Sequence, residues 1–284
     1  MTPTSAFCAP DSTVDSSTAD TAPRRQPGGV CAIHQPNLFP RLSTLAKLYA
    51  ADQWIVLDDV QFARRDYQHR ARLAVLADPA RQQWLTLPTH LPHGRQTLIK
   101  DARLADLHRS RRTVELLVRQ YYRRSPHWPA LDGVLDAVLA RFEETDRLAD
   151  IAETSMRATL DALGWPGQVM HSSGLPARRG RSERLADLAH ATGSTHYLCG
   201  PGGLRYLTAE PFDAHSIPIL PFHVPVGDSD LWGWAAKVSS LWALGGIGRK
   251  ALEEQLSTQR DAVIQKPFTA AAQTVRGTIR SQEK

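Results

Sequence analysis

The sequence has 284 residues, of which 42% are hydrophobic, and this suffices for one large domain or two small ones. Three cysteines without metal-type spacing argue against a disulfide framework or a zinc site and fit a reducing cytoplasm, where we expect the protein. The net charge of +5 comes from scattered arginine clusters without a long basic run, so nucleic-acid binding is not expected, and no apolar run approaches the roughly 18 residues of a membrane span.

The chain opens with a polar segment and then a strand–helix–strand unit. Residues 1–28 are small, polar and proline-containing, which predicts a disordered tail without a signal peptide. A buried strand is expected at about 29–34. Ser43 is the expected N-cap of a helix that ends near Ala51, and Trp54–Leu57 reads as a second buried strand. This order predicts a parallel βαβ unit.

The rest of the chain alternates in the same way. Two strands are expected at His69–Leu76 and Gln83–Thr89, joined by a turn at Asp78-Pro79. The further expected elements are a helix over 104–121, a broken helical stretch over 131–163, a strand at 168–171, a helix over 182–191 capped by Ser182, a strand at 196–199, an edge strand within 217–222, and a final buried helix containing Trp232, Trp234, Leu241, Trp242 and Leu244. We therefore predict one α/β domain over 29–265, with a central mostly parallel sheet flanked by helices, followed by a polar tail over 266–284.

Polar side chains follow the first two strands, where the carboxyl ends of parallel strands meet. They are His34, Gln35 and Asn37 after the first strand, and Asp58, Asp59 and Gln61 after the second. A carboxylate beside a histidine can tune the imidazole as a general base. The same residues also suit other roles: a proline-rich loop bonded to backbone, a turn, a helix cap, or a carboxylate pair that holds Mg²⁺ through phosphates.

Arginines and a glycine-rich segment extend this candidate site. Arg65 and Arg70 could clamp a phosphate or a carboxylate. The segment from Gly200 through Gly202 and Gly203 could offer backbone N–H groups to an anion, although tight turns use the same residues. Cys31 and Cys199 are expected to pack in the core.

The order of these motifs resembles the WbqC-like protein family. The matching segments are His34–Pro40, Leu57–Phe62, Arg65, Arg70, Trp84–Pro88, Tyr121–Pro126, Ser172-Ser173, Ser182-Glu183-Arg184 and Tyr197–Gly203 through Tyr206. The resemblance covers about residues 30–248, and it implies that Ser173, Glu183, Arg184, Gly202, Gly203 and Tyr206 bind substrate. Two departures stand out. Val238–Trp242 lacks an acid that the family often carries there, and some relatives have Met in place of His34.

Members of the family occur among surface-polysaccharide genes and beside natural-product pathways, and aminoacyl transfer to an amino sugar has been suggested for some. We therefore expect an acyl- or aminoacyltransferase that forms an amide without a cofactor or a bound metal. Its partners would be a thioester-type donor, on a carrier protein or a coenzyme, and an amine-bearing small molecule. His34 would accept the amine proton, and Asp59 would orient His34 or bind the amine.

Two other functions stay open at this stage. One is a Mg-dependent nucleotidyl transferase or acyl-adenylate-forming ligase, with the Asp58-Asp59 pair holding the metal. The glycine segment matches neither a P-loop nor the dinucleotide fingerprint, and this counts against a nucleotide-dependent function. The other is a non-enzymatic module that binds a carrier protein or nucleic acid through its arginines.

Overall fold

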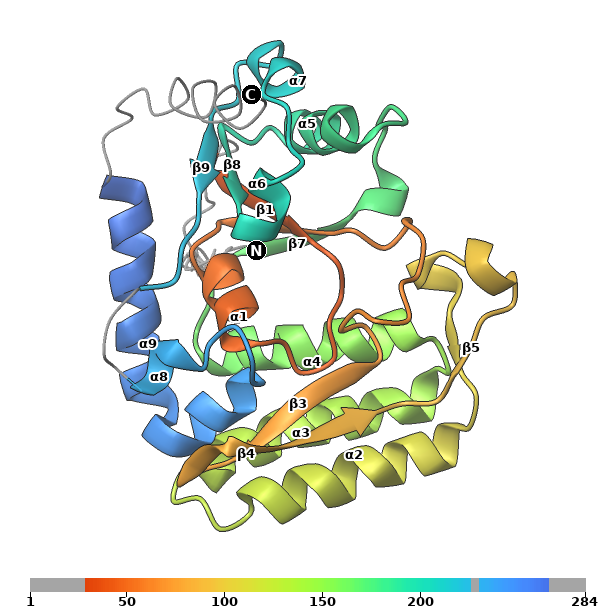
Figure 1. The fold of residues 1–284 in the computed structure, drawn as a ribbon, viewed down its shortest axis with the longest axis vertical. Coiled ribbons are helices and arrows are strands. Elements are labelled where there is room, and N and C mark those ends of the chain that lie inside the picture. The colour runs from red at the N-terminus through yellow and green to blue at the C-terminus, as the bar shows by residue number, and fades with distance from the viewer. Residues whose placement is uncertain (1–28, 226–229, 266–284) are drawn as a thin grey trace, which may run out of the picture.

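A five-stranded sheet forms the centre of the molecule, and the computed structural model describes residues 29–225 and 230–265 (Figure 1). The strands are β1 (Val30–His34), β2 (Gln53–Val56), β7 (Gln168–His171), β8 (His196–Cys199) and β9 (Ile219–Pro221). Their order is β7-β2-β1-β8-β9, and every neighbouring pair is parallel. The predicted α/β class is confirmed, with β9 at the expected edge. The predicted tails, 1–28 and 266–284, lie outside the described residues.

Helices cover both faces of this sheet, which explains why its inner strands are mostly apolar. Alternate residues of each strand face opposite sides. One face packs with α1 (Leu42–Tyr49), α4 (Leu148–Ala162) and α9 (Ser240–Gln265). The other packs with α5 (Arg181–Ala191) and α7 (Glu210–Asp213). Cys31 and Cys199 are buried in this second face, and burial raises the pKa of both thiols, as expected for packing residues.

A second layer is built on an antiparallel hairpin of β3 (Arg70–Val75) and β4 (Asp78–Thr86). The helices α2 (Leu107–Tyr122) and α3 (Trp128–Glu144) lie along this hairpin in Figure 1. The two strands were predicted, but the turn at Asp78-Pro79 was wrong, because the chain reverses at Leu76–Ala77 and Pro79 belongs to β4. The short elements are β5 (Thr89–His90), η1 (Gly94–Gln96), η2 (Ile99–Asp101), β6 (Arg103–Leu104), η3 (Ser172–Gly174), α6 (Pro201–Leu204) and α8 (Asp230–Gly233). Among the described residues, no helix is long and apolar enough to cross a membrane.

Both predicted serine caps were wrong, and tertiary contacts explain why. The helix α1 begins at Leu42, and the Ser43 N–H donates to Ala235 O at 2.9 Å. The helix α5 begins at Arg181, and Ser182 Oγ accepts from the Thr208 N–H at 3.0 Å. Long-range partners therefore take the polar groups that a local cap would use.

The predicted final helix is present but divided. Residues 234–239 separate α8 from α9, and α9 is kinked at Gly248, which has φ 80°. A Cβ on Gly248 would lie 2.6 Å from the His127 ring, so both conformation and space require glycine there. Trp242 is buried in α9 together with Leu241 and Leu244, as predicted.

Trp242 also makes one polar contact, which gives a test of its role. Its Nε1–H donates to Leu76 O at 3.3 Å, at the turn of the β3–β4 hairpin. Trp242→Phe keeps an aromatic ring but removes this donor, so we expect the free energy of unfolding to fall by about 1 kcal/mol in urea denaturation. Trp234→Phe, which loses no hydrogen bond among the described contacts, serves as the control. An equal loss in both variants would show that ring size, and not the hydrogen bond, matters.

Candidate functional site

The carboxyl ends of the parallel strands meet at one edge of the sheet. Register pairs His34 with Val56 and Val56 with His171, so the loops that follow β1, β2 and β7 start side by side. In the sheet, β2 lies on one side of β1 and β8 lies on the other. The strand order therefore reverses between β1 and β8. In open α/β sheets, ligands usually bind in the crevice at this topological switch point. The predicted convergence of the His34 and Asp58 segments at one edge is confirmed.

His34 ends β1 and is held from both ring nitrogens. Its Nδ1 lies 3.3 Å from Lys47 Nζ, and its Nε2 lies 3.1 Å from Asn37 Oδ1. Lys47 Nζ also donates to Ile33 O at 3.2 Å. Lys47 was not predicted as a site residue, yet its side chain crosses from α1 to the end of β1 and is only 7% exposed. A Cβ on Gly200 would lie 3.6 Å from Lys47 Cδ, which places the lysine between β1 and the residue that follows β8.

Burial controls the protonation of this pair. It lowers the pKa of Lys47 from 10.5 to about 8, because the ammonium loses its water. Burial, and next the charge of Lys47, hold the pKa of His34 well below its usual range. With Lys47 protonated, His34 Nδ1 accepts from the ammonium and the ring proton sits on Nε2, where it donates to Asn37. When Lys47 is neutral, the ring proton can sit on Nδ1 and donate a hydrogen bond to Lys47 Nζ. His34 Nε2 then carries no proton and can accept one.

The second half of the site is a carboxylate–serine cluster between β2 and β7. Asp58 is buried and accepts from Ser173 N (3.0 Å) and Ser173 Oγ (2.7 Å). Ser172 Oγ lies 3.0 Å from Asp58 Oδ1 and 2.5 Å from Asp59 Oδ1, so its single proton is shared between two carboxylates. The other oxygen of Asp59 pairs with Arg184 from α5. Asp59 is therefore engaged by Ser172 and Arg184. The orientation of His34, which we expected from Asp59, comes from Asn37 and Lys47.

This cluster predicts a structural role for Asp58. Asp58→Ala would leave the Ser173 N–H and the Ser173 hydroxyl without their acceptor, so we expect the free energy of unfolding to fall by about 1–3 kcal/mol. Urea denaturation measures this change. Asp136→Ala, at an exposed position of α3, is the matched control and should change stability by less than about 0.5 kcal/mol. Unchanged stability in Asp58→Ala would mean that the carboxylate serves a ligand alone.

The remaining residues predicted after β1 and β2 make their hydrogen bonds outside these two groups. Gln35 Oε1 accepts from Gln68 Nε2 at 2.5 Å, and the second amide atom, Gln68 Oε1, is buried without a partner among the described residues. Gln61 is exposed and donates to Arg95 O at 2.5 Å. Arg70 donates to Asp66 O at 3.1 Å and to the backbone oxygen of Arg65. Gln68 was not predicted, and the buried pairing with Gln35 is the reason to include it.

The residues that follow β8 are arranged differently from the expectation. Gly202 and Gly203 belong to the one-turn helix α6, and the Gly203 N–H already donates to Gly200 O at 3.0 Å. A Cβ on Gly203 would lie 2.6 Å from Cys199 Sγ, so this glycine permits close packing. Tyr206 is 62% exposed and lies under the Arg181 guanidinium, at 4.9 Å from its ring centroid. Glu183 lies against the Gly180 backbone at the start of α5.

Comparison with known proteins agrees with the sequence motifs. The model of the WbqC-like protein family matches residues 35–225. The chain belongs to the WbqC-like protein family. It is 27% identical over 229 residues to an uncharacterized protein of Mycobacterium tuberculosis, Rv1507c, a match that covers 78% of this chain and 94% of the relative. No solved structure matches the chain.

The family match covers almost all of the site described here. It includes Lys47, the Asp58–Asp59 pair and Arg184, and it begins one residue after His34. Trp242 and the rest of α9 lie beyond it. The WbqC-like match therefore includes the strands β2, β7, β8 and β9 and the segments that follow them, and it begins directly after β1.

Metal ligation needs a group of suitable side chains. Within 29–225 and 230–265, no group of three or more His, Cys, Asp or Glu side chains is arranged to hold a metal ion. The oxygens of Asp58 and Asp59 are taken by serines and by Arg184. A metal held by the aspartate pair would have to displace these partners.

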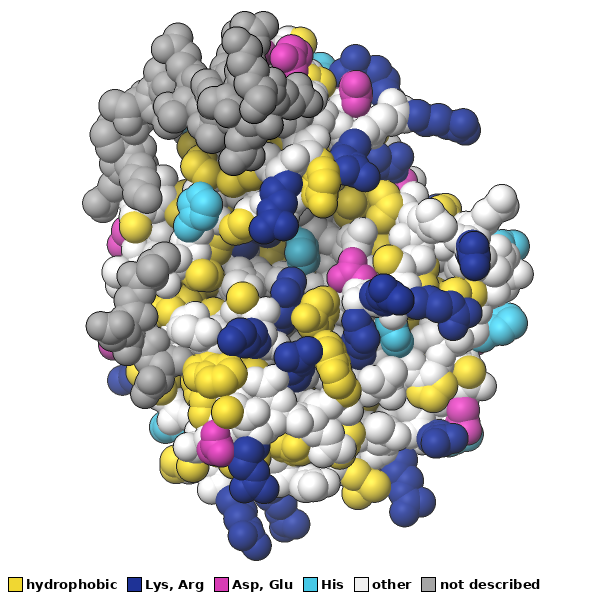
Figure 2. All heavy atoms as spheres, in the orientation of Figure 1, with side chains coloured by type: hydrophobic (Ala, Val, Ile, Leu, Met, Phe, Trp, Pro, Cys, Tyr) yellow, Lys and Arg dark blue, Asp and Glu magenta, His cyan; other side chains and the backbone are white. Residues whose placement is uncertain are grey.

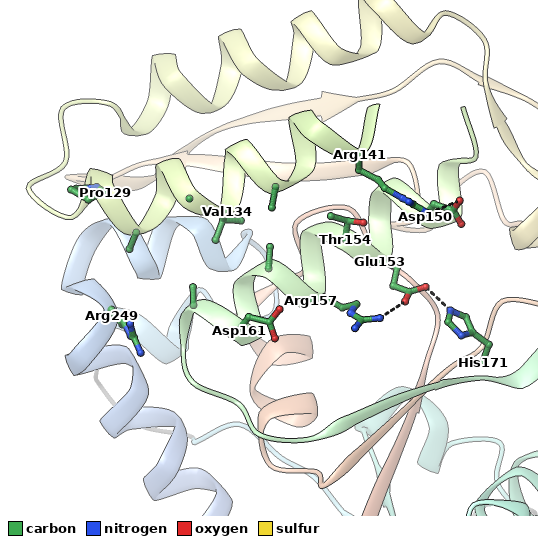
Figure 3. Close-up of a pocket in the computed structure, with 15 residues that line it drawn as sticks. Pro129, Val134, Arg141, Asp150, Glu153, Thr154, Arg157, Asp161, His171 and Arg249 are labelled. Carbon is green, nitrogen blue, oxygen red and sulfur yellow. Dashed lines mark hydrogen bonds and ion pairs between the residues drawn. The ribbon is translucent and has the colours of Figure 1, made fainter. Parts of the chain in front are cut away.

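A separate groove of about 920 Å³ lies on the helices of this WbqC-like chain, between α3 and α4 (Figure 3). Two sets of ion pairs line it: Glu153 lies 2.8 Å from His171 Nε2 and 3.4 Å from Arg157, and Arg141 lies 3.1 Å from Asp150. The Glu153 carboxylate raises the pKa of His171. None of the predicted site residues lines this groove, so it is distinct from the site at the strand ends.

Proposed function

We propose that this chain is an acyl- or aminoacyltransferase that forms an amide between a thioester-type donor and an amine acceptor, in polysaccharide or natural-product biosynthesis. The observation that supports this best is the contact between Lys47 Nζ and His34 Nδ1 at the switch point. A lysine that is half neutral near pH 8, next to a neutral imidazole, is suited to removing a proton from an amine.

The chemistry follows from the two nitrogens of the ring. The acceptor amine attacks the thioester carbonyl carbon, a C–N bond forms and the C–S bond breaks. The amine takes the place of Asn37 at His34 Nε2 and gives it a proton. The Nδ1 proton passes to neutral Lys47, and the released thiolate is reprotonated from Lys47 or solvent. The pair thus acts as a proton relay, in which the transfer from Nδ1 to Lys47 follows the existing contact between these two nitrogens.

Two further groups support binding of an amine. Gln68 Oε1 is a buried acceptor without a partner among the described residues, and it offers a contact for a substrate N–H beside Gln35. The Asp59–Arg184 ion pair lies beside the end of β2, where it would contact an acceptor bound at the strand ends. In this role Asp59 fixes the shape of the acceptor side and is not the base.

The decisive experiment is amide formation by the purified full-length protein. An aminoacyl thioester and an amino sugar are incubated without ATP, and amide and released thiol are followed by mass spectrometry and thiol titration. We expect equal amounts of amide and thiol, and product formation slower by roughly 10²–10⁴-fold with the His34→Ala variant. Product that appears only with ATP and Mg²⁺, together with AMP, would overturn the transferase and indicate an adenylate-forming ligase.

A further inference from the structure

An alternating row of arginine and aromatic side chains adjoins the candidate site. We call this row the arginine–aromatic ladder, and its members in order are Arg41, Tyr67, Arg70, Trp84 and Arg72. Arg41 Cζ lies 4.2 Å from the Tyr67 ring centroid, and Arg70 Cζ lies 5.9 Å from Tyr67 and 4.6 Å from Trp84. Arg72 Cζ lies 4.4 Å from Trp84 on the far side. Figure 2 shows dark blue side chains interleaved with yellow ones across this part of the molecule, between the β3–β4 hairpin and α6.

The local fold explains the row. Arg70 and Arg72 are two residues apart on β3, so they share one face of the hairpin. Trp84 on β4 stands opposite Arg72 in the antiparallel register. Stacking on the rings holds the guanidinium groups in place, which lowers the conformational entropy that binding would otherwise cost.

Within the part of the chain that the structure describes, no carboxylate pairs with the arginines of the ladder. Arg41 donates to the backbone oxygen of Ala236, and Arg70 donates to the backbone oxygens of Asp66 and Arg65. Arg72 donates to the side-chain oxygen of Gln82. All of these acceptors are neutral. Among the described residues, none of these three arginines is in an ion pair. Three guanidinium groups without a carboxylate form a concentrated positive field that suits several negative charges.

The ladder is continuous with the loop that carries the proposed base. Arg41 directly follows the His34–Pro40 segment, and its charge also contributes to the low pKa of His34, after burial and Lys47. Tyr67 O accepts from the Leu38 N–H at 2.9 Å, which ties the two loops together. A ligand held on the ladder can therefore extend its other end toward His34.

We propose that the ladder binds the phosphate groups of the acyl donor, and that the donor is a coenzyme A thioester. This inference rests on the proposed transferase function and names its donor. Coenzyme A carries a diphosphate and a 3′-phosphate, and these several negative charges suit the three arginines of the ladder. The phosphopantetheine arm of a carrier protein carries one phosphodiester, which would leave most of this positive charge without a partner.

Calorimetric titration of the full-length protein with coenzyme A tests the assignment. We expect Arg70→Gln and Arg72→Gln each to raise the Kd about tenfold or more, since each removes a charge-assisted contact. Arg112→Gln, an exposed arginine of α2 outside the ladder, should leave the Kd within about twofold. Inorganic pyrophosphate should displace coenzyme A from the wild type, and added salt should weaken wild-type binding more than binding to the variants.

Three outcomes overturn the assignment: coenzyme A affinity unchanged in the two ladder variants, failure of pyrophosphate to compete, or ladder-dependent binding of a phosphopantetheinylated carrier protein or of RNA in place of coenzyme A. The pyrophosphate competition uses the wild type, so it decides the question even if a variant fails to fold. Failure of the transferase function is separately visible. If coenzyme A binding depends on the ladder but no amide forms, the transferase function is wrong and the ladder assignment stands. If amide forms and the KM for the thioester is unchanged in the ladder variants, the transferase function stands and the ladder assignment is wrong.

Discussion

Replacing Lys47 by methionine is expected to lower the rate of amide formation by roughly 10²–10⁴-fold, the usual effect of removing a general base. Methionine has a similar length, so the packing of α1 against the sheet is kept while the final proton acceptor is lost. His34 then has no group to receive its Nδ1 proton. Initial rates with saturating thioester and amine, compared with those of wild type and of Arg112→Gln, measure the change.

The same variant is expected to change the pH dependence. Wild-type activity should rise with pH through about 8, because only neutral Lys47 accepts a proton, and it should then level off. The residual activity of Lys47→Met should show no rise in this range. Lys47→Arg, which stays protonated, should also be inactive over the whole range.

In the Lys47→Met variant, stability should change in the opposite direction from activity. The pKa of Lys47 is about 8 in the folded protein and 10.5 when the side chain is free, so the unfolded chain binds more protons between these values. The cost of burying the ammonium is therefore fully present below pH 8 and is relieved as the pH rises toward 10.5. Lys47→Met removes this cost, and its Tm at pH 7 should equal or exceed that of wild type. A clearly lower Tm, together with an activity loss that is uniform in pH, would show that Lys47 is structural.

The polar residues at the ends of β1 and β2 could be predicted, because they directly follow short apolar segments of the sequence. Val30–Ile33 and Trp54–Leu57 are apolar runs separated by one short helix, and a parallel βαβ unit is the arrangement that buries both. The polar residues after each run then fall at one edge. The resemblance to WbqC-like proteins added Ser173 and Arg184, which the structure brings to the aspartates.

Lys47 was missed because a lysine within an amphipathic helix is usually exposed. The available signal was the position of α1, an eight-residue helix between two buried, mostly apolar strands. Such a helix must lie against the sheet, and α9 covers it further, so seven of its residues are buried. A charged residue in this position has to reach a polar partner, and the carbonyl and imidazole at the end of β1 are the groups within reach.

The contacts between β2 and β7 could not have been predicted from local patterns. Asp58 and Ser172 are 114 residues apart and meet only because β7 pairs with β2 after the hairpin and three helices. The same holds for Arg41 and Tyr67, which belong to different layers. Periodicity identifies each element, but the order of strands in the sheet decides which side chains meet.

His34→Ala is expected to lower turnover by roughly 10²–10⁴-fold, because it removes the group that takes the proton from the amine. A variant that lacks both His34 and Lys47 gives a stricter test of the relay. If His34 and Lys47 pass one proton between them, removing both should cost no more than removing the worse of the two alone. A double variant whose loss equals the product of the two single losses would mean that the residues act separately, and the contact at 3.3 Å would then have no catalytic meaning. The measurement is kcat for wild type, both single variants and the double variant, all at pH 9, where Lys47 is mostly neutral.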